Sequence, residues 1–291
     1  MSWHLGTEGP TREPDGENRM IQRDYVHLCQ PGEGKSCGAC CGLYNYADSR
    51  ETSLACRLRK RTHLFRSTIR GREDLPNYAA RISETEDTAK RYEVIYCCEY
   101  LGFIDPEEQK VGCLLHPCQN GGEDWRNVSF YGKELCDGHF CPSYHYLSRE
   151  ESLALVHIIK DWYLYGLCVT DIDLVKGWFR LIADTVHEMP GAHRFVEGAL
   201  RDVSLQFFSL KLTWPYRSRE TNRLGKYYFD GSQYMIKPID YAAFGCEQSR
   251  FDKIFQSLAS EFHHKEEIRQ AEAIIQGYID DFAVQYGQDF R

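Results

Sequence analysis

A cluster of cysteines near the N-terminus is the feature that most restricts how this chain can fold. Residues 36–42 read Ser-Cys-Gly-Ala-Cys-Cys-Gly, which places Cys37, Cys40 and Cys41 within five residues. The two glycines permit tight, left-handed turns that direct neighbouring thiols toward one centre. A C-x-x-C spacing in a glycine-rich loop is typical of metal or redox sites and is hard to explain by apolar packing.

More cysteines follow downstream, which favours a metal site over an isolated redox pair. Zinc and iron–sulfur centres are usually bound by four thiolates, and histidine is a common substitute. We therefore predict a metal-binding module whose thiol ligands are Cys37, Cys40, Cys41, Cys98, Cys113, Cys136 and Cys141. Further ligands remain open among Cys29, Cys56, Cys97, Cys118, His116 and His139.

Three cysteines, Cys97, Cys168 and Cys246, carry less weight as ligands. Cys97 and Cys98 are adjacent at the end of a short β-prone run, Glu93–Tyr96, and adjacent side chains of a strand point to opposite faces. Only Cys98 is then expected to reach the site directly. Cys168 and Cys246 stand alone in apolar-rich sequence, where a free cysteine is usually a small buried hydrophobe.

The composition restricts the compartment and the partners. Thirteen cysteines are an odd number, which does not suit a fully paired disulfide framework. Residues 1–20 lack the apolar segment of a secretory signal, and no run of about 18 apolar residues predicts a membrane span. We expect a cytoplasmic protein, because clustered cysteines in a reducing compartment more often serve metal or redox chemistry than disulfides. The net charge of -8 argues against nucleic acid as a partner of the whole chain.

The distribution of cysteines, glycines and helix-spaced apolar residues along the sequence predicts a mainly α fold in two parts. Residues 1–29 read as a disordered tail, and residues 30–147 as an irregular, Cys-rich module with little β structure. Residues 148–291 read as a mainly helical domain with one β-hairpin near 226–237, where Asp-Gly separates two aromatic runs. A loop-rich module with few aliphatic residues needs a staple, and a metal can provide it.

Particular elements follow from local patterns. A hairpin around the Asp105–Lys110 turn is predicted to bring Cys98 and Cys113 together. Residues 57–72 contain seven basic side chains and predict an amphipathic helix with a solvated basic face. Ser148 and Glu151 form a capping box that begins a helix ending at Gly166. Further helices are predicted from Thr170 to Pro190, from about 196 to Trp214, and from 251 onward.

The cysteine motifs also resemble a known family. Cys37-Gly-Ala-Cys40-Cys41-Gly, Cys98-Glu-Tyr-Leu and Cys113-Leu-Leu-His-Pro are similar to the CxxCxxCC (YkgJ-like) family of zinc- or iron-chelating proteins, over residues of about 34–142. The family's first cysteine would fall at Gly34, and its R-P-x-x-C element is interrupted here by an insertion. The resemblance implies a zinc or iron–sulfur site on these cysteines and no defined reaction.

Two functions are consistent with the sequence. Adjacent cysteines cannot easily bind one ion together, which favours an iron–sulfur cluster with a redox or electron-transfer role, and the helical part then offers a docking surface for an unidentified protein partner. The alternative is a non-enzymatic, zinc-stabilised module for partner binding, which a ligand such as His139 would favour. No paired carboxylates, cofactor fingerprint or Cys/His/Asn signature identifies a reaction or a small-molecule substrate, so enzymatic activity stays open.

Overall fold

The computed structural model describes residues 26–32, 34–219 and 238–288. Within these ranges the fold is mainly α, as predicted, with one small two-stranded sheet. The hairpin predicted near 226–237 lies outside the described residues. None of the described helices is long and apolar enough to cross a membrane.

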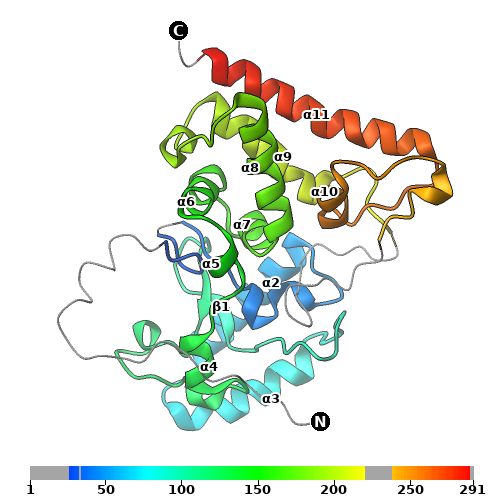
Figure 1. Ribbon diagram of the computed structural model, residues 1–291. Coiled ribbons are helices and arrows are strands. Elements are labelled where there is room, and N and C mark those ends of the chain that lie inside the picture. Colours follow the sequence, from blue (N-terminus) through cyan, green and yellow to red (C-terminus); the bar gives the residue numbers. More distant parts are fainter. Residues whose placement is uncertain (1–25, 33, 220–237, 289–291) are drawn as a thin grey trace.

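The Cys-rich half is built from short elements around one longer helix, and it occupies the lower part of Figure 1. Its order is η1 (Ala39–Cys41), η2 (Leu43–Asn45), α2 (Glu51–Thr68), η3 (Arg72–Asp74), α3 (Leu75–Thr85), β1 (Leu101–Phe103), β2 (Val111–Cys113), η4 (Pro117–Gln119), η5 (Arg126–Val128), α4 (Gly132–Gly138) and α5 (Ser143–Tyr146). The basic stretch is helical as predicted, although α2 begins before residue 57 and ends at Thr68.

The predicted hairpin is confirmed, whereas the predicted strand before it is wrong. Strands β1 and β2 are antiparallel, and Leu101 pairs with Cys113. Residues 93–96 form a turn instead of a strand. Val94 is 82% exposed there. The run therefore buries too little apolar surface to stabilise a strand at the edge of a sheet.

The C-terminal half is a set of helices that fills the upper part of Figure 1. They are α6 (Arg149–Ile158), α7 (Trp162–Val169), α8 (Ile172–Val186), η6 (Ala192–Phe195), α9 (Ala199–Thr213), η7 (Ala242–Phe244), α10 (Asp252–Ser257) and α11 (Lys265–Gln288). The capping box is confirmed: Ser148 Oγ accepts from Glu151 N at 3.2 Å, and Glu151 Oε2 accepts from Ser148 N at 2.7 Å.

One predicted helix is divided in two. The single helix expected from 148 to 166 breaks after Ile158, because Asp161 caps a new helix by accepting from Leu164 N at 2.7 Å. Gly166 lies inside this second helix, α7, and does not end it. An added Cβ at Gly166 would lie 2.1 Å from Tyr44 Oη, so the glycine is needed for close packing.

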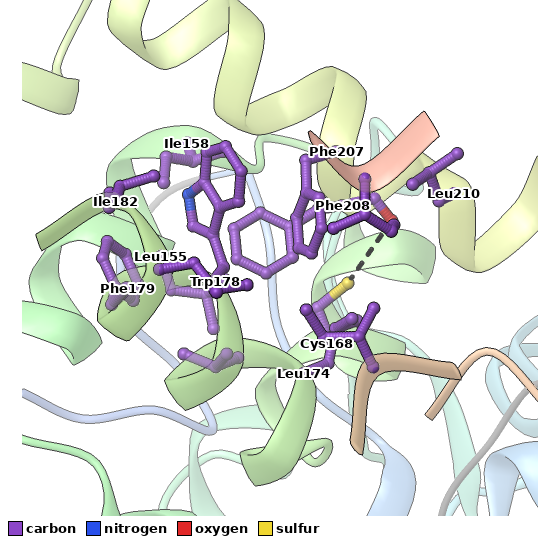
Figure 2. Close-up of a cluster of buried hydrophobic side chains, with 14 of the residues drawn as sticks. Leu155, Ile158, Cys168, Leu174, Trp178, Phe179, Ile182, Phe207, Phe208 and Leu210 are labelled. Carbon is purple, nitrogen blue, oxygen red and sulfur yellow. Dashed lines mark hydrogen bonds between the residues drawn. The ribbon is translucent and has the colours of Figure 1, made fainter. Parts of the chain in front are cut away.

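An aromatic core holds the C-terminal helices together (Figure 2). Trp178 of α8 stacks on Phe207 of α9 with ring centroids 4.3 Å apart. Cys168 of α7 is fully buried beside them, with Sγ 4.0 Å from the Phe208 carbonyl oxygen. Cys168 is therefore a packed apolar residue, as predicted.

Helix α7 joins the two halves. All eight of its residues are buried, as expected for a helix that is apolar on every side. Tyr44 Oη donates to the Tyr163 carbonyl at 3.2 Å, and Tyr165 Oη donates to the Leu28 carbonyl at 2.8 Å. Leu28, which we predicted to lie in the tail, is only 2% exposed and belongs to the C-terminal core. The chain is therefore anchored just before its first candidate ligand, Cys29.

A glycine substitution tests the role of α7. Gly166→Ala is expected to destabilise the fold by about 1–3 kcal/mol, because the new methyl group overlaps Tyr44 Oη. Gly277→Ala is the matched control, since Gly277 is exposed inside α11 with nothing near its added Cβ, and we expect it to be neutral or stabilising by about 0.5–1 kcal/mol. Urea unfolding measures both. Tyr44→Phe should restore part of the loss in the Gly166→Ala background, and equal stability of the two alanine variants would contradict the packing argument.

Candidate metal centre

Most of the cysteines open into one cavity of about 770 Å³ in the Cys-rich half. All thirteen cysteines lie within the described ranges, and all are free thiols. Nine of them line this cavity: Cys29, Cys37, Cys40, Cys41, Cys98, Cys113, Cys118, Cys136 and Cys141. His27, His116 and His139 line it as well.

The cavity includes all seven predicted ligands and separates the adjacent pair Cys97 and Cys98. Cys98 lines the cavity, whereas Cys97 does not. The Cys97 thiol instead donates to the Gly42 carbonyl at 3.3 Å and lies 3.6 Å from Asn45 Nδ2. Of this pair, only Cys98 therefore faces the cavity, although the predicted strand is absent.

Gly42 lets the first cysteine segment approach the second. Its φ of 78° is in the left-handed region that favours glycine, and an added Cβ would lie 2.2 Å from the Tyr96 carbonyl oxygen. Next to this close approach, Cys98 N donates to the Cys41 carbonyl at 2.9 Å. The two segments therefore run in contact, and the thiols of Cys41 and Cys98 enter the cavity together.

Helix α2 supports the Cys98 segment from the side opposite the cavity. Arg61 is 2% exposed; its Nη1 donates to the Cys98 carbonyl at 2.8 Å, and its Nε donates to Glu86 Oε1 at 2.8 Å. Arg57 also pairs with Glu86. The expectation of a fully solvated basic face is therefore wrong for these two arginines. Glu86, whose carboxylate pairs with both arginines, was not identified from the sequence.

Tyr144 connects Cys29, which precedes the first cysteine motif, to Cys141. Its hydroxyl accepts from Cys29 N at 3.0 Å and lies 3.4 Å from Cys29 Sγ. Tyr144 N donates to the Cys141 carbonyl at 3.0 Å, and Cys37 N donates to the Cys29 carbonyl at 2.9 Å. Cys29 is thus held between Cys37 and Cys141, which the sequence spacing did not reveal. No local pattern marks a tyrosine that acts 115 residues away.

Arg126 and Cys136 both line the cavity as well. Arg126 is buried, and it pairs with Asp124 at 2.7 Å and with Asp137 at 2.9 Å. The second pair ties η5 to α4, the helix that carries Cys136. Cys136 Sγ lies 3.7 Å from Ser129 Oγ.

Burial and mutual repulsion disfavour negative charge on most of these thiols. Burial, and then Cys113 and Cys136, raise the pKa of Cys41 to about 12. Burial, and then Cys41 and Glu99, raise the pKa of Cys98. A hydrogen bond with Cys40 lowers the pKa of Cys141. Several thiolates in this cavity would therefore need positive charge beside them, and a metal ion supplies such charge.

The described side chains are near one another without being arranged as a finished coordination sphere. No three His, Cys, Asp or Glu side chains in these ranges are grouped so that they could hold a single metal ion. Burial lowers the pKa of both His116 and His139, which favours their neutral, ligand-competent form. His116 Nδ1 accepts from Cys118 N at 3.2 Å, so Nε2 carries the proton of the neutral ring, and binding of a metal through Nε2 would require that this hydrogen bond be broken.

Comparison with known proteins adds no relative: no family model, curated protein or solved structure matches this chain.

The support given by Arg61 can be tested by stability. Arg61→Gln leaves the Cys98 carbonyl without its charged donor and is expected to lower the free energy of unfolding by about 3 kcal/mol. This is the low end of the range for breaking a buried ion pair, because Arg57 still pairs with Glu86. Arg59→Gln on the same helix is the control. Arg59 pairs with Glu108 in an exposed position, so we expect a change of less than about 1 kcal/mol. Similar midpoints in urea for the two variants would show that Arg61 does not support this segment.

Proposed function

We propose that this cavity binds an iron–sulfur cluster through cysteine thiolates and that the protein serves redox or electron-transfer chemistry. The observation that carries the proposal is the gathering of nine thiols from separate chain segments around one cavity. Free buried cysteines are usually scattered through a core as small hydrophobes, as Cys168 is here. The resemblance of the cysteine motifs to zinc- or iron-chelating proteins points in the same direction.

The donor set fits such a cluster. Iron–sulfur clusters are bound by cysteine thiolates, and a volume of about 770 Å³ exceeds what one tetrahedral ion needs. Each thiol can change direction by rotation about one side-chain bond, and the proposal requires such changes of rotamer, because no three potential ligands among the described side chains are grouped around one point. The cluster would bring the positive charge that the buried thiols lack.

The chain's own contribution is to hold and shield the cluster. An iron–sulfur cluster supplies one-electron transfer when it is bound. Apolar side chains of the cavity wall, such as Leu101 and Ile104, limit the access of water, and Arg126, which pairs with Asp124 and Asp137, also lines the cavity. Solvent exposure and charge near a cluster set its reduction potential. A reducing, cytoplasmic environment is part of this proposal.

Structural zinc is the second candidate, and one observation favours it. His116 and His139 line the same cavity as the thiols, and mixed nitrogen and sulfur ligands are typical of structural zinc. In that case the module would fix the fold for binding a partner protein.

Composition of the purified protein tests the proposal. Protein prepared without oxygen is expected to contain iron and acid-labile sulfide in equal amounts and to absorb visible light. Cys98→Ser should at least halve both contents, whereas Cys97→Ser should retain them, because only Cys98 lines the cavity. Zinc without visible absorption would favour the structural alternative. A wild-type protein without any metal would end the proposal.

Removal of the metal should loosen the Cys-rich half selectively. After chelation under reducing conditions, trypsin is expected to cleave first near Arg126 and Lys133, in the short elements between η4 and α5, because these elements bury little apolar surface of their own. The helices from α6 onward should persist as a large fragment. Mass spectrometry of timed digests gives the order of cleavage, and an identical order with and without metal would count against a metal staple.

A further inference from the structure

We infer that the cavity holds two metal centres, each bound by four thiolates, and that Cys29 is a ligand of the first. The inference rests on the proposed function and goes beyond it, because it fixes the number of centres and adds a ligand that no motif identifies. The first thiol set is Cys29, Cys37, Cys40 and Cys141. The second thiol set is Cys41, Cys98, Cys113 and Cys136.

The adjacent residues Cys40 and Cys41 divide the cavity. Both belong to the 3₁₀ helix η1, in which successive side chains are about 120° apart. Two such neighbours point in different directions, so they cannot easily serve the same centre, yet both line the cavity. The geometry of η1 therefore directs one thiol toward each set.

The first set is held together by contacts among its own members. Cys40 and Cys141 both line the cavity. The Cys29 carbonyl accepts from Cys37 N at 2.9 Å, and Tyr144 links Cys29 to Cys141. Both ends of the set are also attached to α7 or its immediate vicinity: Ser143 Oγ donates to the Val169 carbonyl at 2.5 Å, and Tyr165 Oη donates to Leu28 next to Cys29.

The second set is built on the hairpin and on its contacts with η1. Cys98 N donates to the Cys41 carbonyl at 2.9 Å, and Leu101 N donates to the Cys98 carbonyl at 3.4 Å. Leu101 in turn pairs with Cys113 in the sheet. Trp125 N donates to the Leu115 carbonyl at 3.1 Å, which brings η5 and then α4 with Cys136 against the exit of β2.

The two sets are neighbours and not remote sites. All eight cysteines line one cavity, and Cys40 of the first set is adjacent in η1 to Cys41 of the second. Cys118 lines the cavity but shares none of the contacts that hold either set; its backbone nitrogen instead donates to His116. It therefore serves as a matched control among the lining cysteines.

The experiment measures iron and sulfide per chain in protein prepared or reconstituted anaerobically with iron and sulfide. Cys29→Ser and Cys113→Ser are each expected to retain about half of the wild-type content, because four thiolates per cluster leave the other centre intact. The double variant should retain almost none, and Cys118→Ser should match the wild type. Far-UV circular dichroism checks that each variant is folded.

Electron paramagnetic resonance gives a second, independent result. Partly reduced protein should give the electron paramagnetic resonance signal of a single reduced centre. Fully reduced protein should give the spectrum of two magnetically interacting centres, and this interaction should disappear in Cys29→Ser. A single non-interacting signal in fully reduced wild type would overturn the inference. Complete loss of iron in either single variant would do the same, because it indicates one shared centre, and so would an unchanged iron content in Cys29→Ser. In these cases the iron in the wild type still supports the proposed function, whereas an iron-free wild type removes both.

Discussion

The burial of α7 between the two halves is the constraint on which the rest of this structure depends. An apolar helix of eight residues has no stable place at a surface, and here each of its sides is covered. The helices of the C-terminal half pack against Leu164, Tyr165, Cys168 and Val169 of α7, and the segment around Tyr44 packs against Trp162, Tyr163 and Leu167. Because Gly166 leaves no gap beside Tyr44, the two halves meet at close-packed distance. The cysteine-bearing segments therefore start from a rigid support.

The segments that carry the thiols are attached to two supports. Contacts with α7 and with the end of α6 position the segments around Cys29, Cys37 and Cys141; among these, Lys35 Nζ donates to the Ile159 carbonyl at 2.5 Å. Helix α2 positions the Cys98 segment through Arg61 and β1 through Thr62, whose Oγ1 accepts from Phe103 N at 2.8 Å. Thiolates gathered in a buried cavity are costly without positive charge beside them. Helix packing and a buried ion pair thus keep these thiols near one another.

The sequence predicted the fold class and most helices because amphipathic spacing and capping are local. The capping box of Ser148 and Glu151 is an example, and so is the hairpin that delivers Cys113. Two failures have tertiary causes. The run at Val94 was expected to be a strand but has no partner in the described fold, and Gly166 was expected to end a helix but serves a contact with a residue 122 positions earlier.

The site was predictable to a similar degree. The short spacing of the cysteines in the sequence identified seven of the nine cysteines that line the cavity. Cys29, Tyr144 and Glu86 were not predictable, since each acts through contacts between segments far apart in the chain. How the lining thiols divide also depends on the direction of side chains on η1, which spacing alone does not fix.

X-ray absorption at the iron edge tests the central claim most directly, because it reports the atoms bound to the metal in the whole protein. For the anaerobically loaded protein, the account predicts a first shell of sulfur atoms and a second shell of iron. A first shell of oxygen or nitrogen atoms, with no iron neighbour, would show that the iron is bound elsewhere and would contradict the claim that the thiols of this cavity hold a cluster.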